Sequence, residues 1–549
     1  MATPIDIRAD HLRIVHDMLR RHLPDGVRVW VFGSRATWAT KDSSDLDLAL
    51  EGDGEIPPRS LSALEAAFED SDLPYAVDVV DLKRIGERFR RTVEQQLVRL
   101  PESDAGSGVR TNPVRSVSLR NLCEEIVDCP HSTPKWTPDG VIVLRSKNIR
   151  NGRLDLSQPS YTSEKDYAQR IRRATPRAGD LVITREAPIG EVCMIPEGLR
   201  CCLGQRMVLL RPSLVATDSR YLLYALQSEP VQQEIRSHDG TGSTVSNLRI
   251  SLLEDLRIPS HPLSEQRAIA HVLGTLDDRI ELNRRMNATL EAMARALFKS
   301  WFVDFDPVRA KMEGRDTGLP KEIADLFPDR LLDSELGEIP EGWQLKSLDS
   351  VAGFQNGLAL QKFRPSQNEA RLPVVKIAQL RAGEANSGEW ASASIKPECI
   401  IEDGDVVFSW SGSLLVRTWC GGRAALNQHL FKVTSERYPK WFYLHSIFSH
   451  FPEFQRIAAD KATTMGHIRR HHLTDALCVV PPDCLITRVS GLFGGLLERR
   501  VANEVASCTL ASLRDALLTR LVSGKLRVAG LEPASVPDDR PAPVETHAT

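Results

Sequence analysis

The chain has 549 residues, of which 42% are hydrophobic and 26% charged; this profile is typical of globular proteins, excludes wholesale disorder and predicts roughly three to five domains. The net charge of −3 excludes a uniformly basic nucleic-acid coat and confines any nucleic-acid site to a local patch. No stretch approaches the ~18 consecutive apolar residues of a membrane span, and the N-terminus lacks the features of a secretion signal, so we expect a cytoplasmic protein with no membrane partner.

Residues 1–100 predict a small α/β domain in which three carboxylates converge. Asp45 and Asp47 are two residues apart on one predicted strand, so their side chains share a face. A later predicted strand, Tyr75–Val80, supplies Asp78. Three converging carboxylates offer the oxygen ligands that Mg²⁺ prefers, and the metal would also hold triphosphate oxygens.

The spacing of Gly33-Ser34, ten further residues and then Asp45-Leu-Asp47 resembles the minimal nucleotidyltransferases of the polymerase-β-like superfamily. The resemblance implies that Gly33 and Ser34 bind nucleotide phosphate and that Asp45, Asp47 and Asp78 are catalytic ligands of Mg²⁺. It also implies transfer of a nucleoside monophosphate from a nucleoside triphosphate. Because several such domains act as antitoxins, a helical toxin is an expected partner of this domain.

Residues 101–117 are rich in proline, glycine and serine and predict a linker. The chain then repeats itself at a long period. Leu119–Leu122 recurs as Leu345–Leu348, an offset of 226, and Asn283 recurs as Asn503, an offset of 220. A smoothly falling offset predicts two copies of one large unit, because solenoid repeats are only ~20–50 residues long.

Each copy predicts a compact α+β domain followed by a long helix. The two domains are expected at 118–262 and 341–483, and the helices at 263–304 and 484–527, with a connector at 305–340. Apolar residues in 4–3 spacing predict that the helices pair as a coiled coil, and about 40 residues would span roughly 60 Å. Residues 528–549 predict a disordered tail.

The expected fold class is therefore multidomain α+β: an N-terminal α/β domain, then two similar α+β domains related by a pseudo-twofold axis and joined through an antiparallel helix pair. Asn283 and Asn503 occupy equivalent seam positions of the two helices. We expect them to face each other and fix the helix–helix register, although a lone seam asparagine is more often solvated or bonded locally.

Two like domains, each followed by a long helix, resemble the specificity subunits of type I restriction–modification systems. The resemblance implies that each globular domain is a target recognition domain reading half of a bipartite site in double-stranded DNA, without a cofactor. It also implies that the helices hold the domains apart and dock methyltransferase subunits, two in number, and through them restriction subunits. The segments that carry it are Pro262–Leu273, Leu276–Ile280, Leu297–Asp306, Gly337–Trp343 and Leu521–Leu526.

Basic and amide side chains can be nominated for DNA contact. A run of arginines suits phosphates, and polar residues at or just after strands could reach base edges; the alternative for each is a solvated loop residue. The candidates are Lys147, Asn148, Arg170, Arg172, Arg173, Lys376 and Gln379.

Two rival hypotheses remain open at the level of sequence. The protein could be primarily a nucleotidyltransferase or antitoxin-like enzyme with a DNA-targeting body, or a scaffold built on the coiled coil without a DNA role. The chain contains no Gly-x4-Gly-Lys-Ser/Thr and no adenine-methylation motif, so cleavage and methylation are expected from partner subunits. The ten cysteines include no C-x-x-C pair and predict reduced thiols.

Overall fold

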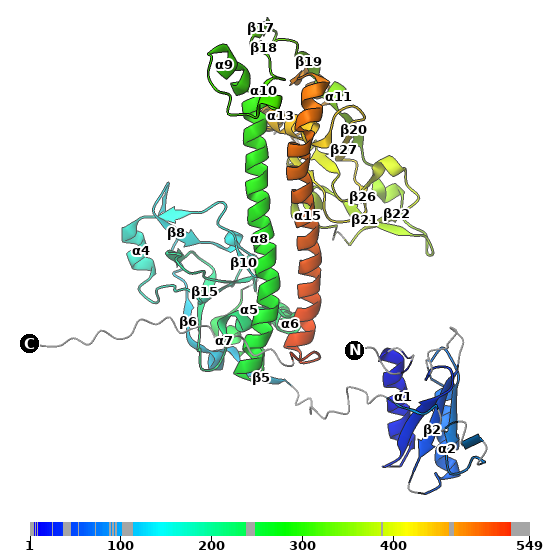
Figure 1. Cartoon of the computed structure of the whole chain (residues 1–549). Helices are drawn as coiled ribbons and strands as arrows, with labels where there is room; N and C mark the ends of the chain where they lie inside the picture. The colour runs from blue at the N-terminus through cyan, green and yellow to red at the C-terminus, as the bar shows by residue number, and fades with distance from the viewer. Residues whose placement is uncertain are drawn as a thin grey trace, which may run out of the picture. The chain divides into compact units, whose positions relative to one another are not determined.

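The computed structural model (Figure 1) describes two stretches of the chain. The first is residues 5–100, except 6, 8, 25, 37–44, 53, 72, 87–88, 91–92 and 94–95, and the second is residues 114–528, except 238–246, 386–387 and 461–465. The chain divides into two compact units, 1–112 and 113–549. No helix in these two stretches has the length and apolarity needed to cross a membrane.

The N-terminal unit is built on a four-stranded sheet in the order β3-β2-β1-β4. β1 is antiparallel to β2 and β4, whereas β2 and β3 are parallel because α2 crosses between them. Alternating leucines of β2 lie in the core, which explains why this segment forms a strand with one buried face. The elements are α1 (Ala9–His22), β1 (Arg28–Phe32), β2 (Leu46–Glu51), α2 (Pro58–Glu69), β3 (Val77–Asp81) and β4 (Val98–Arg99).

The first repeat domain, defined as residues 114–262, contains two four-stranded sheets, ordered β13-β12-β15-β6 and β14-β8-β11-β7, and two separate strand pairs, β5–β16 and β9–β10. Its helices α5, α6 and α7 pack against the first sheet through an apolar cluster. The elements are β5 (Arg115–Ser118), β6 (Cys123–Asp128), β7 (Trp136–Thr137), β8 (Val141–Leu144), β9 (Ile149–Arg150), β10 (Arg153–Leu154), β11 (Tyr161–Thr162), α4 (Glu164–Arg170), β12 (Leu181–Thr184), β13 (Val192–Met194), β14 (Cys201–Leu203), β15 (Met207–Pro212), α5 (Ser219–Gln227), α6 (Glu229–Ser237), α7 (Ile250–Asp255) and β16 (Arg257–Ser260).

The second repeat domain, residues 341–482, contains β19 (Gln344–Ser347), α11 (Leu348–Val351), β20 (Gly353–Asn356), β21 (Arg371–Val375), α12 (Ile377–Ala382), β22 (Trp390–Ser392), β23 (Ile400–Ile401), β24 (Val406–Ser409), β25 (Leu415–Thr418), β26 (Ala424–Leu426), β27 (Leu430–Thr434), α13 (Lys440–Asp460), α14 (Arg470–Asp475) and β28 (Leu477–Val480). Its sheets, β25-β24-β27-β20 and β22-β21-β26-β23, and its strand pair β19–β28 mirror those of the first copy.

The two repeat domains share the first sheet strand by strand, whereas in the second sheet β14 is an edge strand and its counterpart β26 lies between β21 and β23. The sheet β13-β12-β15-β6 and the sheet β25-β24-β27-β20 are both fully antiparallel. In the second sheet of each domain one pair is parallel, β8 with β14 and β21 with β26. The prediction that the chain carries two copies of one α+β unit is therefore confirmed.

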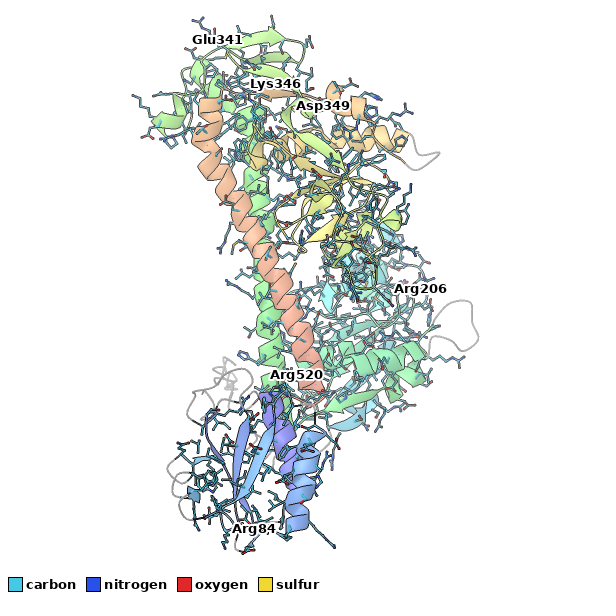
Figure 2. The ribbon with its side chains drawn as sticks, turned by 90° about the vertical axis from the view of Figure 1, so that its right-hand side faces the viewer. Arg84, Arg206, Glu341, Lys346, Asp349 and Arg520 are labelled. Atoms are coloured by element: carbon cyan, nitrogen blue, oxygen red, sulfur yellow. The ribbon has the colours of Figure 1, made fainter. Side chains whose placement is uncertain are left out.

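Two helices of 40 residues each, α8 (Leu263–Phe302) and α15 (Asp483–Val522), connect the repeat domains. Both begin directly after a proline, which has no N–H to donate and so suits a helix start. They lie side by side along their length and run in opposite directions, as Figures 1 and 2 show in green and red. The predicted antiparallel pairing is confirmed, and a connector with α9 (Asp306–Met312), α10 (Lys321–Ala324) and the hairpin β17 (Leu331–Ser334)–β18 (Gly337–Pro340) follows α8.

The predicted element bounds need three corrections. Residues 115–117 belong to β5 rather than to a linker, because they close a strand pair with β16. The helices end at Phe302 and Val522, a few residues before the predicted 304 and 527. The rest of the predicted linker, 101–113, and the predicted tail from 529 onward lie outside the described residues.

An aromatic cluster packs the second repeat domain against the C-terminal end of α8 and the N-terminal end of α15. Phe493 of α15 stacks on Trp441 at a ring distance of 4.5 Å and meets Trp301 of α8 edge-on at 5.6 Å. His445 of α13 is 5% exposed and stacks on Phe298 at 5.3 Å. Burial, together with the charges of nearby Arg500 and Arg295, lowers the pKa of His445 to about 3, so this histidine is neutral in the folded protein.

The low pKa of His445 predicts a pH-dependent stability. Between about pH 3 and the ordinary histidine pKa of 6.5, the unfolded chain binds a proton that the folded chain does not. The free energy of unfolding should therefore fall as the pH drops through this window, by up to about 1.4 kcal/mol per pH unit from this residue. Thermal unfolding from pH 7 to 4 should show a smaller loss for His445→Phe than for the unmodified chain. Exposed His471→Phe is the control, and equal slopes for all three proteins would contradict the assignment.

Candidate functional site

The predicted carboxylates of the N-terminal unit lie on, or directly before, two parallel strands. Asp47 of β2 is the direct register partner of Asp78 of β3, and Asp45 comes two residues before Asp47. Partial burial raises the pKa of the Asp47 carboxyl, and the negative charges of Asp78 and Asp45 raise it further. The three carboxylates are thus close enough to repel one another, which is the electrostatic setting that a divalent cation relieves.

The loop after β1 approaches the same carboxylates. Gly33 has a φ of +75°, a left-handed conformation that favours glycine. A Cβ atom at this position would lie 2.2 Å from Oδ2 of Asp47. Glycine is therefore required both by the backbone and by the close approach of Asp47. The sequence did not predict a role for Arg35. This arginine is buried, with its guanidinium 3.8 Å from the ring centre of Tyr75. No local sequence pattern predicts this contact.

The carboxylates fit Mg²⁺ by chemistry and by their crowding. In the part of the chain that the structure describes, however, no three or more carboxylate, histidine or cysteine side chains are spaced as a ready ligand set. Asp47 and Asp78 are the pair whose strand register best suits a shared metal ion.

Lys147 and Asn148, which follow β8, have different environments. Lys147 is exposed, whereas Asn148 is 3% exposed. The Asn148 side chain accepts a hydrogen bond from the Arg145 backbone N–H at 3.0 Å and donates to the Asp155 carbonyl at 2.9 Å. The structure therefore assigns Asn148 to a turn inside the domain, and the predicted contact between Asn148 and DNA is not supported.

The predicted basic run at 170–173 also contains both buried and exposed side chains. Arg170 is 5% exposed, and its guanidinium donates to the carbonyls of Leu203 at 3.0 Å and Ser132 at 3.2 Å. Arg170 thus has its hydrogen-bond partners inside the first repeat domain, and its predicted phosphate contact is not supported. Arg172 and Arg173 are exposed, and both stay candidates for phosphate contact.

In the second repeat domain, Lys376 and Gln379 follow β21, the strand equivalent to β8. Lys376 is half-buried and forms an ion pair with Glu389. Gln379 is half-buried too, and its Oε1 atom is buried with no hydrogen-bond partner in the described residues. An unsatisfied buried oxygen is costly, so this side chain would gain a partner if it turned outward to a ligand.

The two seam asparagines meet at the centre of the helix pair. The Asn283 side chain donates to the Asn503 carbonyl at 3.3 Å and to Ser507 Oγ at 3.2 Å. The Asn503 side chain donates to Asn287 Oδ1 at 3.0 Å. The structure thus brings Asn283 and Asn503 together, as expected, but their contact runs from a side chain to the backbone, and Asn287 is the side-chain partner of Asn503.

Charged groups tie the first repeat domain to both helices. Asp277 of α8 accepts hydrogen bonds from Tyr224 at 2.7 Å, from Arg514 of α15 at 2.7 Å and from Arg153 at 3.1 Å. Burial alone would raise the pKa of Asp277, but the hydrogen bonds from Tyr224 and Arg514 outweigh it and lower the pKa. This carboxylate therefore stays ionised and fixes the domain to the helix pair.

The second repeat domain is tied to the same helices in a similar way. Arg500 of α15 donates to Glu291 of α8 at 3.1 Å and to Thr418 Oγ1 at 2.9 Å. Glu504 of α15 forms an ion pair with Arg417 of the domain. Neither repeat domain is thus held by apolar packing alone.

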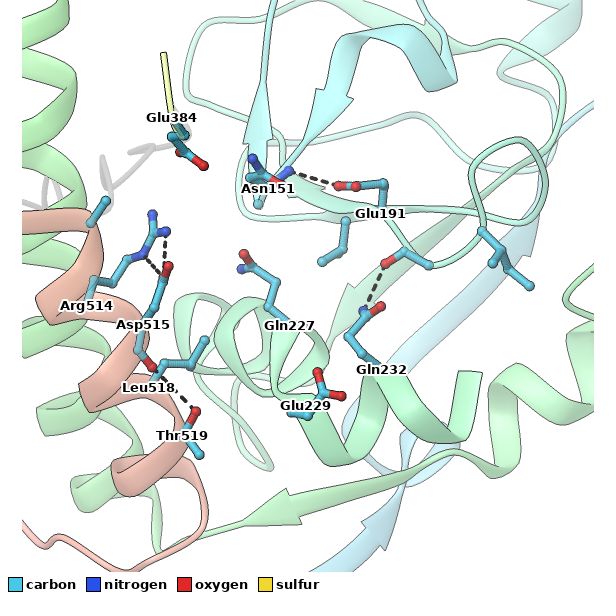
Figure 3. A pocket seen from close by; sticks show the side chains of 15 residues that line it. Asn151, Glu191, Gln227, Glu229, Gln232, Glu384, Arg514, Asp515, Leu518 and Thr519 are labelled. Carbon is cyan, nitrogen blue, oxygen red and sulfur yellow. Dashed lines mark hydrogen bonds and ion pairs between the residues drawn. The ribbon is translucent and has the colours of Figure 1, made fainter. Parts of the chain in front are cut away.

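A cavity of about 470 Å³ opens between the first repeat domain, the C-terminal part of α15 and Glu384 of the second repeat domain (Figure 3). Among the described residues, four carboxylates line it, and Arg514 is the one basic side chain. The negative charge would repel DNA phosphates, so this cavity is not the nucleic-acid interface. The carboxylates are Glu191, Glu229, Glu384 and Asp515.

Comparison with known proteins assigns both parts of the chain. The family described as type I restriction modification DNA specificity domain matches residues 125–292, and the family described as polymerase beta, nucleotidyltransferase matches residues 16–105. The MjaIX type I specificity subunit of Methanocaldococcus jannaschii is 27% identical over 413 residues, 74% of this chain and 88% of that protein. The probable protein adenylyltransferase MntA of Haemophilus influenzae is 36% identical over 100 residues, 18% of this chain and 87% of that protein. A crystal structure of a type I S subunit from M. genitalium aligns with a TM-score of 0.44 and 15% identity, over 75% of this chain and 97% of that one.

The asparagine geometry predicts a specific pattern of energetic coupling. Asn503→Ala and Asn287→Ala should each lower the free energy of unfolding by about 1–2 kcal/mol, since each leaves a buried polar group unpaired. The double substitution should cost less than the sum, by about 0.5 kcal/mol or more. Asn283→Ala with Asn503→Ala is the matched control and should be closer to additive, because Asn283 contacts only the backbone of residue 503. Denaturant unfolding measures the three single and two double variants, and the opposite ranking of the two couplings would disprove the arrangement.

Proposed function

The chain belongs to the specificity subunits of type I restriction–modification systems and carries a polymerase-β-type nucleotidyltransferase domain at its N-terminus, and we propose that its two repeat domains each read one half of a bipartite DNA site. The observation that carries this proposal is the repetition of one fold at opposite ends of an antiparallel helix pair. A rigid spacer between two base readers specifies both half-site sequences and their separation.

The outer faces of the helix pair support docking of partner subunits. Four apolar side chains, two on each helix, are exposed and available for contact with a partner. A groove of about 840 Å³ also runs between α15 and the second repeat domain, along Leu497, Val501 and Ala502. We propose that methyltransferase subunits, two in number, bind here and bring restriction subunits with them. The exposed apolar residues are Leu282, Met293, Leu492 and Leu513.

For the N-terminal unit we propose transfer of a nucleoside monophosphate from a nucleoside triphosphate to a hydroxyl group of a protein partner, a helical toxin among the candidates. The hydroxyl oxygen bonds to the α-phosphorus, and the α–β phosphoanhydride bond breaks to release pyrophosphate. Asp45, Asp47 and Asp78 would hold Mg²⁺, which neutralises triphosphate charge when bound. Gly33 and Ser34 would bring the backbone close to the phosphates. Support comes from the mutual repulsion of the carboxylates and from the collision that any Cβ at Gly33 would cause.

We place the protein in the cytoplasm. All ten cysteines are free thiols, and burial raises the pKa of most of them, to about 12 for Cys193 and Cys478. Buried thiols of this kind suit a reducing compartment.

Surface cations of the first repeat domain should contribute to DNA affinity without specifying sequence. Lys147→Ala and Arg172→Ala should each weaken binding similarly for all duplexes and lower the salt slope by about one ion. Arg170→Ala, two residues from Arg172 but buried, should instead destabilise the domain. The measurement is binding of the complex with its methyltransferase subunits to selected and random duplexes at several salt concentrations. Unchanged salt slopes for Lys147→Ala and Arg172→Ala would remove these residues from the interface.

The proposed transfer reaction can be tested at Gly33. Gly33→Ala should displace the Asp47 carboxylate and abolish label transfer from α-labelled ATP with Mg²⁺, as Asp47→Asn should. Gly26→Ala is the matched control, because Gly26 also has a positive φ, of +90°, but has open space where a Cβ would lie. Both glycine variants carry a backbone penalty of about 1 kcal/mol, so thermal unfolding should shift similarly in both. Transfer that survives equally in Gly33→Ala and Gly26→Ala would refute the site.

A further inference from the structure

In the first repeat domain, the ends of strands from both sheets meet at one edge. β8 and β14 are parallel and end side by side at Leu144 and Leu203. The turn that follows β14, residues 204–206, is held to both sheets. Its Gly204 N–H donates to the Leu144 carbonyl at 2.8 Å, and its Arg206 carbonyl accepts from the N–H of Arg185, just after β12, at 2.8 Å. We name this turn, with residues 185–186, the first edge.

The first edge presents one arginine outward. Arg185 is 9% exposed and donates twice to the Asp128 carboxylate, at 2.8 and 2.9 Å, so it is fixed inside the domain. Arg206, labelled in Figure 2, has a side chain that is 56% exposed. Its backbone has a φ of +67°, which a residue other than glycine rarely adopts. The Arg206 guanidinium pairs with Glu186 at 3.1 Å, so the N–H donors of a guanidinium lie beside a carboxylate.

The second repeat domain builds the same edge with different side chains. Residues 427–429 follow β26, which is parallel to β21, as β14 is to β8. The N–H of Ile468 donates to the carbonyl of Trp410, after β24, at 3.0 Å, just as Leu248 donates to the Arg185 carbonyl at 3.1 Å. His429 is the last residue before β27, as Arg206 is before β15, so the two positions are equivalent, although the φ of His429 is not positive. Its Nδ1 atom lies 3.0 Å from Ser411 Oγ.

We propose that these two edges read the bases, with Arg206 and Glu186 recognising a G·C pair in one half-site and His429 recognising the other half-site. The inference rests on the proposed DNA function and adds the residues that set the sequence. In the major groove guanine offers two acceptors, O6 and N7, which match the arginine fork, and cytosine offers an amino donor, which matches a carboxylate. A bipartite target with two different half-sites requires two like domains that carry different side chains at equivalent turns.

A phosphate contact for Arg206 fits the edge less well. Glu186 lies within 3.1 Å of the guanidinium, so a phosphate bound by Arg206 would also meet a carboxylate. Like charges at that distance oppose each other. A base pair, which presents both acceptors and a donor, satisfies the two side chains together.

The test is selection of preferred sites from a random duplex library by the complex of the full chain with its methyltransferase subunits. Arg206→Ala should lose the preference for G·C at one position of one half-site, by on the order of tenfold or more, and leave the other half-site unchanged. His429→Ala should alter only the other half-site. Arg206→Gly, which adopts the positive φ readily, should repeat the result and exclude an effect of backbone strain.

Arg200→Ala is the matched control. Arg200 lies at the opposite end of β14, is 58% exposed and pairs with a glutamate, Glu164, as Arg206 does. It should leave both half-sites unchanged. Equal weakening on every sequence by Arg206→Ala would make Arg206 a phosphate ligand and overturn the inference, as would unchanged preferences. If the unmodified complex enriches no bipartite sequence, the proposed function itself fails, and the inference fails with it.

Discussion

The placement of everything in the C-terminal unit depends on the pairing of α8 with α15. The pairing is apolar at its ends and polar at its centre. Trp301 and Phe493 pack at one end, Leu273 and Leu521 share a core cluster at the other, and Asn283 and Asn503 lie between them. Apolar contacts tolerate sliding, whereas a buried amide loses its partner when the register changes. A slip would leave several polar groups unpaired at about 1–3 kcal/mol each, so the centre defines the register that the ends merely stabilise.

The register matters because the repeat domains are attached to it by directional contacts. Asp277 is bound at once by side chains from α15 and from the first repeat domain, and Arg500 links α8, α15 and the second repeat domain. Ion pairs and hydrogen bonds have narrow geometric tolerances. A domain anchored in this way keeps its orientation as well as its distance, and two readers of one DNA duplex need both.

Sequence alone predicted the twin fold and the helix pair because duplication leaves a signal that any single segment lacks. The offset between Asn283 and Asn503 is enough to align the sequences of the two helices without the structure. Contacts across the fold left no such signal. The partners of Arg170 are carbonyls 33 and 38 residues away, so its burial could not be separated from the exposure of Arg172. The burial of Asn148 was likewise not predictable, since only the folded turn brings Asp155 beside it. In the N-terminal unit the spacing of the carboxylates was informative, because strand periodicity alone places Asp45 and Asp47 on one face.

The same duplication explains how one architecture can hold two different readers. The positions that the copies share are mostly backbone hydrogen bonds and buried apolar strands, such as the antiparallel ladders of β12 and β24. These contacts do not depend on which side chain the following turn carries. Arg206 beside Glu186 offers a guanidinium and a carboxylate, whereas His429 beside Ser411 offers an imidazole and a hydroxyl of shorter reach. Because the turn is held by its own backbone, its side chains can change without disturbing the core or the helix pair. The DNA sequence that the protein recognises can therefore change without a change in the stability of the protein.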